Sequence, residues 1–518
     1  MEREQLAQLE HLDRGLVAVH TSEGNYLSWR LLGGEAAGCG DKGLIGVHFH
    51  LYRDGRRIAT VEDSTNYLDR DGTLSSVYWV CAVEDGRELE RSAEARPWEN
   101  GYCELPLRKP DGGVTPAGEA YTYSANDMSV GDVDGDGRYE FFVKWDPSNS
   151  KDVSHSGYTG PVYIDCYKLD GTLLYRIDLG VNIRAGAHYT QLLVYDFDGD
   201  GKAEVMLKTA PGTKVVRFGA RGNVVSERRI TMPPEDEAAG YGHDDDYRCS
   251  RKDYYEHIVR TFMAWHEHEE VRAGHWPPTL EQCFGMEDQY RYPLSRTDAE
   301  ALADHFFDVY APSRSGRNNL RAFEGFVLHG PEYLSVFRGE DGEELETIRY
   351  KPGRHDDGLM WGDYSWNRIE PGNRVDRFLA GVAYLDGCKP YAIFTRGYYT
   401  RAAVAAYGWD GKRLREVWYA DSGWVPMDNP FRDTLGRRDG RSETWGALAG
   451  QGAHSLSVAD VDGDGCHEII YGAATIDHDG TLLYSSEGVL PEGSAAPGAI
   501  AKLGHGDALH VAATDPAR

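Results

Sequence analysis

The sequence predicts an all-β protein: a small N-terminal β unit, then a β-propeller that carries a helical insertion. The main observation is an acidic loop with the pattern Asp-x-Asp-Gly-Asp-Gly-x-x-Glu, which occurs three times and is each time followed by an apolar, strand-like run. The composition agrees, because 61 Gly, 32 Tyr and 12 Trp among 518 residues are typical of a turn-rich, aromatic-rich β protein. A chain of this length exceeds the roughly 100–200 residues of one domain, so several units are expected.

Charge and hydropathy exclude some classes of function. The chain has 55 Lys and Arg against 84 Asp and Glu, a formal net charge of −29, which disfavours binding to nucleic acid. The mean hydropathy is −0.55, and no apolar run approaches the roughly 18 residues of a membrane span. The first residues lack the pattern of a secretory signal, so we expect a cytoplasmic protein, or a secreted one if the N-terminus was trimmed.

Residues 1–110 are expected to form the N-terminal β unit. Alternating, strand-like runs occur at residues 26–30, 47–52 and 78–81, separated by Gly, Asp and Asn. The dipeptide Asp54-Gly55 indicates a hairpin turn. Several short strands in fewer than 100 residues predict a small β-sandwich, and this unit resembles a fibronectin type III module.

Residues 111–518 carry the repeats that predict the propeller. The acidic loops begin at Asp132, Asp196 and Asp460, and a degenerate copy contains Asp386-Gly387. An Asp-Gly hairpin signal recurs at residues 170–171, 341–342, 410–411 and 479–480. Strand, acidic loop, strand, hairpin and strand in this order describe a four-stranded propeller blade.

Residues 233–325 interrupt the repeats and are expected to be helical. Residues 253–271 and 297–310 have helix-like patterns. A capping box from Thr297 to Glu300 is predicted to open the second helix. We interpret this segment as an insertion within the propeller.

The acidic loops are predicted to bind Ca²⁺. Aspartates at positions 1, 3 and 5 and a glutamate at position 9 place hard oxygen ligands around one point, and the glycines allow the backbone to turn tightly. The predicted ligands are Asp132, Asp134, Asp136, Glu140, Asp196, Asp198, Asp200, Glu204, Asp460, Asp462, Asp464 and Glu468. The alternative is that these acidic side chains are ordinary solvent-exposed turn residues that bind no ion.

Positions six and eight residues before each loop predict a shared cleft. Residues two apart on a strand share a face, and the innermost strand of each blade borders the central channel. These positions hold Ser124 and Asn126, His188 and Thr190, and Gly452 and His454, with Asp376 and Phe378 in the degenerate copy and His505 and Asp507 near the C-terminus. Polar groups from different blades are therefore expected to line one cleft.

Several strings of residues resemble the rhamnogalacturonan lyases of polysaccharide lyase family 11. They are residues 123–132, 144–152, 182–190 and 504–510, and the resemblance spans most of the chain outside the insertion. It implies an eight-bladed propeller with a calcium-dependent cleft and a pectic rhamnogalacturonan oligosaccharide as substrate. It also implies that Asn126 and Asp146 bind sugar and that His454, His505 and Asp507 hold a calcium ion in the cleft.

Such a lyase removes the C5 proton of a galacturonate and expels the sugar linked to O4. A cation that offsets the carboxylate charge makes this proton more acidic, and a base must reach it. The candidates for the base are Lys144, Lys208, Arg184, His188 and Tyr189. We expect exo rather than endo action, because the absence of a signal sequence points to imported oligosaccharides.

The chain length departs from the family pattern. Without the N-terminal unit and the insertion, it leaves room for about five or six blades rather than eight. The sequence also ends within what would be a further acidic loop, at residues 514–518. We therefore expect a truncated propeller that is inactive or barely active alone. The alternative function is a non-catalytic calcium-binding propeller that binds glycan or protein.

Overall fold

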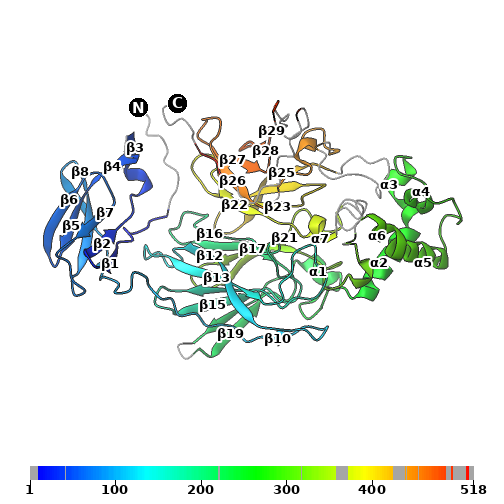
Figure 1. Ribbon diagram of the computed structural model, residues 1–518, viewed down its shortest axis with the longest axis horizontal. Helices are drawn as coiled ribbons and strands as arrows, with labels where there is room; N and C mark the ends of the chain where they lie inside the picture. Colours follow the sequence, from blue (N-terminus) through cyan, green and yellow to red (C-terminus); the bar gives the residue numbers. More distant parts are fainter. Residues whose placement is uncertain are drawn as a thin grey trace.

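The structure is a computed structural model of the chain, and it divides along its long axis into three regions. Figure 1 shows the strands β1–β8 at one end, a group of sheets in the middle and the helices α2–α6 at the other end. The described residues are 10–40, 43–219, 222–314, 316, 318–356, 371–423, 438, 440–452, 454–485, 492–493, 497 and 509–512.

The N-terminal unit consists of two main sheets around one core. Its strands are β1 (Val17–Thr21), β2 (Gly24–Ser28), β3 (Ala36–Gly40), β4 (Gly43–Gly46), β5 (His48–Arg53), β6 (Arg56–Val61), β7 (Asn66–Asp69), β8 (Tyr78–Glu84) and β9 (Arg87–Arg91). The sheets have the orders β1-β2-β7 and β6-β5-β8-β9, and β3 and β4 form a separate pair. Trp29 and Phe49 meet edge to face in the core, 5.5 Å apart. The predicted hairpin is present, because Asp54 and Gly55 both have positive φ between β5 and β6.

Four antiparallel sheets follow in the described residues. The first contains β12 (Tyr123–Gly131), β13 (Glu140–Pro147), β14 (Tyr163–Tyr167) and β15 (Leu173–Asp178). The second contains β16 (Leu192–Tyr195), β17 (Glu204–Thr209), β20 (Tyr333–Arg338) and β21 (Glu344–Arg349). The third contains β22 (Ala380–Ala383), β23 (Tyr391–Arg396), β24 (Ala403–Trp409) and β25 (Leu414–Asp421). The fourth contains β26 (Leu456–Ala459), β27 (Glu468–Tyr471), β28 (Ala474–Ile476) and β29 (Leu482–Ser485).

The four sheets share the order of elements that the repeats predict. In three of them an acidic loop joins the first two strands, and in the third sheet the degenerate copy around Asp386 takes this place. An Asp-Gly turn joins the last two strands of every sheet, and its glycine has positive φ in each case. The prediction of a mostly β chain built from repeated antiparallel sheets is therefore confirmed.

The first strands of successive sheets pack against one another. β12 lies against β16, β16 against β22, and β22 against β26. The approach is close at Gly131 in β12, where an added Cβ would lie 2.5 Å from Val194 Cγ1 and 3.0 Å from Ala203 Cβ. A glycine at this position therefore allows the first and second sheets to pack.

A hairpin and a helical segment separate β17 from its partner β20. The hairpin of β18 (Lys214–Phe218) and β19 (Val224–Arg229) pairs with β15 and extends the first sheet to six strands. The helices are α1 (Pro234–Ala238), α2 (Arg251–Met263), α3 (Glu269–Arg272), α4 (Leu280–Phe284), α5 (Arg296–His305) and α6 (Ala311–Arg314), with a π-helical turn at Phe306–Tyr310. They enclose a core that includes Tyr254, Ile258 and Phe306. The expected helical segment is confirmed.

The predicted start of α5 is wrong. Ser295, rather than Thr297, is the N-cap, and its hydroxyl accepts a hydrogen bond from the Asp298 amide. Glu300, the expected partner in the box, pairs with Arg296 one turn earlier. Both serine and threonine are good N-caps, so residue type alone did not separate the two positions.

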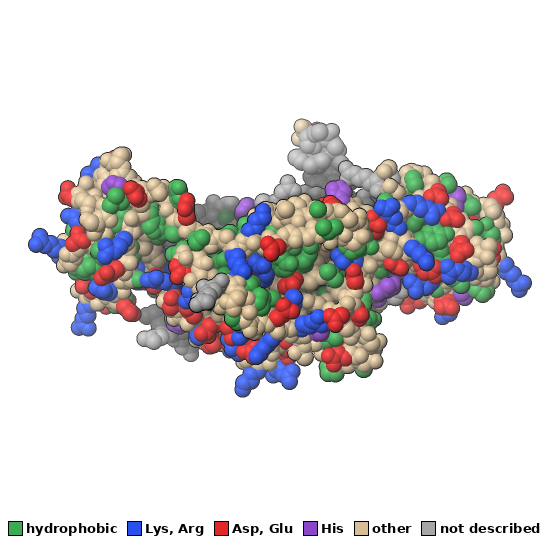
Figure 2. Space-filling model, turned by 90° about the horizontal axis from the view of Figure 1, so that it is seen from below, with side chains coloured by type: hydrophobic (Ala, Val, Ile, Leu, Met, Phe, Trp, Pro, Cys, Tyr) green, Lys and Arg blue, Asp and Glu red, His purple; other side chains and the backbone are tan. Residues whose placement is uncertain are grey.

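The remaining described elements are short. They are the strand pair β10 (Gly113–Val114) and β11 (Ala120–Tyr121), the helix α7 (Pro371–Val375) and 3₁₀ turns at Gly33–Glu35, Trp265–Glu267, Leu320–Ala322 and Gly446–Leu448. No helix in the described ranges is both long and apolar enough to cross a lipid bilayer. On the face that Figure 2 draws, acidic and basic side chains are interspersed.

We expect Gly131→Ala to destabilise the protein by about 1–3 kcal/mol, because the added methyl group overlaps the β-branched Val194 between two sheets. Gly34→Ala is the control, since a Cβ there meets no atom within 4 Å, and it should change stability by less than about 0.5 kcal/mol. Urea denaturation measures both. Equal stability of the two variants would show that the first strands are not tightly packed.

Candidate functional site

Each acidic loop folds around the carboxylate of its first aspartate. In the first loop, Asp132 Oδ1 accepts a hydrogen bond from the Gly135 amide at 2.8 Å, and Oδ2 accepts one from the Gly137 amide at 2.8 Å. Both glycines have positive φ, 77° and 83°. Glu140 closes the loop, because its Oε2 accepts a hydrogen bond from the Val133 amide at 3.0 Å. Glycine is needed at both turns because other residues rarely adopt this conformation.

The other two complete loops repeat this geometry. Asp196 accepts from the Gly199 and Gly201 amides, and Asp460 accepts from those of Gly463 and Gly465. Carboxylate oxygens converge within 4.8 Å of one another in three sets: Asp132, Asp134 and Asp136; Asp196, Asp198 and Glu204; and Asp460, Asp462 and Asp464. Burial together with nearby aspartates raises the pKa of Glu140 to about 7 and that of Glu204 to about 9.

These loops fit a hard cation. Converging carboxylate oxygens and backbone carbonyls are the ligands that Ca²⁺ prefers. The raised pKa values reflect burial first and then negative charges that a cation would offset. Three of the four residues predicted for calcium are thus brought together in each loop, whereas Glu140, Asp200 and Glu468 are not part of these three sets.

A cavity of about 550 Å³ lies where several repeats meet, and it is the candidate active site. The residues that line it are Asn126, Asp127, Asp146, Ser150, Lys151, Asp152, Gly186, Ala187, His188, Gln191 and His454. Asn126 is on β12 and Asp146 on β13, whereas His188 and His454 precede β16 and β26. Three residues predicted from their spacing, namely Asn126, His188 and His454, therefore surround one space together with Asp146, which the family resemblance implied.

A buried lysine supports the acidic side of the cavity. Lys144, 1% exposed, places Nζ 3.6 Å from Asp146 Oδ1 and 3.5 Å from Asp127 Oδ2. Asp146 Oδ1 is buried and makes no hydrogen bond. Burial raises the pKa of Asp146, although the charge of Lys144 opposes this effect. An oxygen held in this way is suited to accept a hydrogen bond from a sugar hydroxyl.

Two histidines and an arginine form the other side of the cavity. Arg377 Nη2 lies 3.2 Å from His188 Nε2 and 3.4 Å from His454 Nδ1, and the two imidazole rings are 5.3 Å apart. Burial, followed by the charge of Arg377, lowers the pKa of His188 to about 4. His188 is therefore neutral at neutral pH, the protonation state that a general base needs.

Four of the five candidate bases lie outside this cavity lining. Arg184 donates hydrogen bonds to the Tyr189 hydroxyl and to the His155 carbonyl, so these side chains hold the backbone beneath the site. Lys208 belongs to a separate buried cluster in which Glu332 lies 2.7 Å from Lys208, 2.8 Å from Arg354 and 2.7 Å from Arg396. Lys144, as described, faces two carboxylates behind the lining. Only His188 among the five candidates lines the cavity in the described part of the chain.

Two of the implied cleft ligands, His505 and Asp507, lie outside the described residues. His454 is described and lines the cavity. Asp376, which the same spacing singled out, faces Arg354 and Arg396 in the buried cluster instead.

The prediction from repeat spacing did not include Arg377, whose guanidinium contacts both His188 and His454. The positions six and eight residues before the degenerate loop are Phe378 and Asp376. They were chosen on the assumption that both belong to one strand, where alternate residues share a face. Residues 376–379 precede β22 and are not part of a strand, so this period does not apply to them.

The sequence analysis also did not select Asp152 as a site residue. Its carboxylate lies 3.9 Å from His188 Nε2, and hydrogen bonds from Ser154 help to lower its pKa against the opposing effect of burial.

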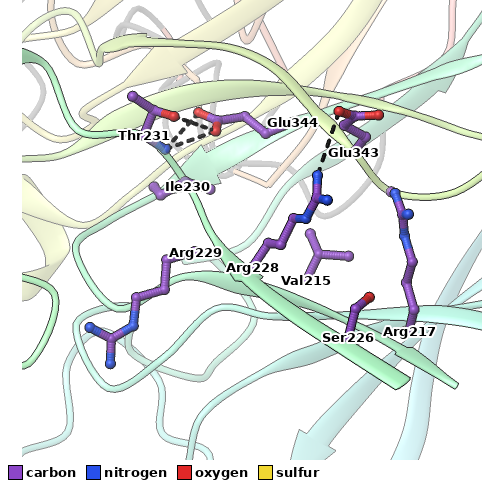
Figure 3. Close-up of a pocket in the computed structure, with 10 residues that line it drawn as sticks. Val215, Arg217, Ser226, Arg228, Arg229, Ile230, Thr231, Glu343 and Glu344 are labelled. Atoms are coloured by element: carbon purple, nitrogen blue, oxygen red, sulfur yellow. Dashed lines mark hydrogen bonds and ion pairs between the residues drawn. The ribbon is translucent and has the colours of Figure 1, made fainter. Parts of the chain in front are cut away.

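A second cavity, of about 260 Å³, lies between the β18–β19 hairpin and the β20–β21 turn. Figure 3 shows its charged side chains turned toward one another: Arg228 points to Glu343, and Glu344 is bonded to Thr231. These groups join the hairpin to the second sheet.

Comparison with known proteins identifies the family. A model described as rhamnogalacturonan lyase family 11, C-terminal domain, matches residues 102–232 and 314–518. A model described as rhamnogalacturonan I lyases beta-sheet domain matches residues 7–98.

Two relatives come from Bacillus subtilis (strain 168). Rhamnogalacturonan exolyase YesX is 43% identical over 515 residues, which cover 99% of this chain and 61% of that protein. Rhamnogalacturonan endolyase YesW is 42% identical over 512 residues, which cover 99% of this chain and 60% of that protein. The chain thus spans about three fifths of the length of these relatives.

Solved structures give the same result. The crystal structure of the exotype lyase YesX matches with a TM-score of 0.67 at 42% identity, covering 99% of this chain and 62% of that one. The Bacillus licheniformis rhamnogalacturonan lyase PL11 matches with a TM-score of 0.68 at 42% identity, covering 99% and 64%. Since the first family model alone covers more than half of the sequence, the chain belongs to rhamnogalacturonan lyase family 11.

Proposed function

We propose that the chain carries the active cleft of a rhamnogalacturonan lyase, which cleaves rhamnose–galacturonate linkages of the pectin backbone by β-elimination. The observation that carries this proposal is the cavity in which Asn126, Asp146, His188 and His454 meet, within a chain of family 11. Oxygen acceptors on one side and the neutral imidazole of His188 on the other suit a substrate that presents both hydroxyl groups and an acidic C–H bond.

In this proposal the residues have separate roles. Asn126 and Asp146 bind sugar hydroxyl groups, and Lys144 holds the Asp146 carboxylate in place. His188 takes the C5 proton as the O4-linked sugar leaves and a C4=C5 double bond forms. Arg377 positions both His188 and His454, because its guanidinium donates to each ring. A neutral imidazole has one lone pair, so the hydrogen bond from Arg377 to His188 Nε2 breaks when this nitrogen takes the proton. His454, with His505 and Asp507, would hold a calcium ion, which when bound offsets the charge of the galacturonate carboxylate.

We propose a structural role for calcium at the three acidic loops. Each loop joins the first two strands of a sheet, and its carboxylates converge there. A cation bound by them would lower their mutual repulsion and stabilise the connection between these strands.

The four sheets, in our proposal, are blades of the propeller at residues 111–518, with the N-terminal fibronectin-III-like unit at residues 1–110 and the insertion at residues 233–325. Contacts between successive first strands support this arrangement. The two family models support the division as well, because one ends at residue 98 and the other omits residues 233–313.

We also propose exo action, the mode expected from the sequence. YesX and YesW are nearly equally similar to this chain, so the test is the size of the products. An exo mode predicts short unsaturated products from the first time point and a slow loss of polymer length. Early products of intermediate length would establish an endo mode instead.

His188→Gln is expected to lower lyase turnover by at least 100-fold while leaving the oligosaccharide bound, because the base is removed and the sugar ligands remain. Turnover is followed by the ultraviolet absorbance of the unsaturated uronate in the presence of calcium. The neighbouring Tyr189→Phe is the matched control and should change turnover only a few-fold, since Tyr189 bonds to Arg184 beneath the cavity.

Lys208→Met tests whether Lys208, rather than His188, is the catalytic base. It should lower the melting temperature but not the turnover of the folded enzyme, because it breaks a buried ion pair away from the cavity. Loss of turnover in this variant at an unchanged melting temperature would refute the assignment of His188 as the base. Sugar binding by the unaltered protein without any absorbance change would favour a non-catalytic glycan-binding module.

Asp146→Asn is expected to weaken the binding of rhamnogalacturonan oligosaccharide by about tenfold or more, since a hydrogen bond to a charged group contributes about 1.5–3 kcal/mol. Isothermal titration calorimetry measures this change. Asp111→Asn, at an exposed position before β10, should leave the affinity unaltered. Equal affinities in the two variants would argue against a sugar-binding role for Asp146.

Removal of calcium by a chelator is expected to lower the melting temperature by several degrees, since an ion that binds only the folded state stabilises it. Asp196→Asn should reduce the number of bound calcium ions by one and reduce this stabilisation. Glu90→Gln, at an exposed position on β9, is the control. A calcium count that Asp196→Asn leaves unchanged would contradict the proposed ligand set.

A further inference from the structure

The acidic loop that begins at Asp460 differs from the other two loops in its surroundings. Position 7 of this loop is Cys466, where the first two loops have Arg138 and Lys202. The β28–β29 turn brings two more potential ligands to it, Asp477 and His478. Asp477 is the first residue after β28, and the equivalent residue of the first sheet, directly after β14, is Lys168.

This difference changes the charge balance. In the first loop, Lys168 Nζ lies 2.6 Å from Asp134 Oδ2 and offsets part of the negative charge. Within the described ranges, no Lys or Arg forms an ion pair with the carboxylates around the third loop, which are those of Asp460, Asp462, Asp464, Glu468 and Asp477. Five carboxylates without a Lys or Arg partner in the described ranges, two of them beside His478, can accommodate a cation.

Two buried polar atoms face this cluster without a hydrogen bond. Glu468 is 0% exposed, and its Oε1 has no hydrogen-bond partner, although Oε2 accepts from the Val461 amide. His478 Nδ1 is also buried and makes no hydrogen bond, yet it lies 2.8 Å from Asp477 Oδ1 and 3.3 Å from Asp464 Oδ2. Trp418 Nε1 donates to the His478 carbonyl at 2.8 Å and so fixes the position of this residue.

Sulfur, nitrogen and oxygen ligands converge at this point. One ligand atom from each of Asp464, Cys466 and His478 lies within 4.8 Å of the others, and the same holds for Glu468, Asp477 and His478. Adjacent nitrogen and oxygen ligands of a tetrahedral zinc ion are about 3.3 Å apart, given metal–ligand bonds of about 2.0 Å. The separation of His478 Nδ1 from Asp464 Oδ2 equals this value.

We propose that the third loop, unlike the first two, binds a divalent transition-metal ion of the zinc class in place of calcium. Cys466, His478 and Asp464 hold the ion, and the carboxylates of Glu468 and Asp477 form a second such set with His478. Thiolate and imidazole favour such ions over Ca²⁺, which prefers oxygen ligands alone. Binding would release the thiol proton of Cys466. The ion would tie the β26–β27 loop to the β28–β29 turn and so link both halves of the fourth sheet.

The test uses cobalt and zinc alone as probes on the whole chain. The protein is stripped of metal, saturated with calcium and then titrated with Co²⁺. We expect a near-ultraviolet thiolate-to-cobalt band and visible bands of tetrahedral cobalt. Cys466→Ser should abolish the near-ultraviolet band, and His478→Gln should weaken cobalt binding by at least tenfold. Cys388→Ser, at a half-buried cysteine of the β22–β23 turn, should change neither.

Native mass spectrometry after dialysis against zinc and excess calcium gives an independent count. We expect one zinc ion more in the unaltered chain than in Cys466→Ser or His478→Gln, with all three proteins giving the same circular dichroism spectrum. Three outcomes would overturn the proposal: no thiolate band, a band that persists in Cys466→Ser, or displacement of zinc by calcium to the level of the variants.

Discussion

The hydrogen bonds between the first aspartate of each acidic loop and the amides of its own glycines are the constraint on which the repeats depend. They turn the backbone within a few residues, and so they fix how the first strand of a sheet passes into the second. The same bonds aim the remaining carboxylates at one point. One short pattern therefore sets both the strand connection and the place where a cation can bind.

The candidate site follows from how the first strands pack. Because they lie side by side, the residues at or just before their starts come together although they are distant in sequence. Asn126, His188 and His454 each belong to a different sheet. Arg377, just before the third sheet, connects two of them, so all four sheets contribute to the site or to its positioning.

The sequence was informative where position within the repeat determines structure. The acidic loops, the Asp-Gly hairpins and the meeting of Asn126, His188 and His454 were predictable because each depends on a fixed offset from an aspartate. The sequence could not decide between Lys208 and His188 as the base, because the contact that removes Lys208 from the cavity, its ion pair with Glu332, depends on tertiary packing. Arg377 and the start of α5 were missed because they depend on local backbone conformation and on which of two suitable caps is used.

The insertion between β17 and β20 has a consequence for how the chain folds. These adjacent strands of one sheet are separated by residues 210–332, so their pairing closes a very long loop, whose entropic cost rises only slowly with length. The intervening helices have a core of their own, and the β18–β19 hairpin joins the preceding sheet. Prior folding of both would bring the two strands near each other, which makes this pairing a late, cooperative step that joins regions already formed.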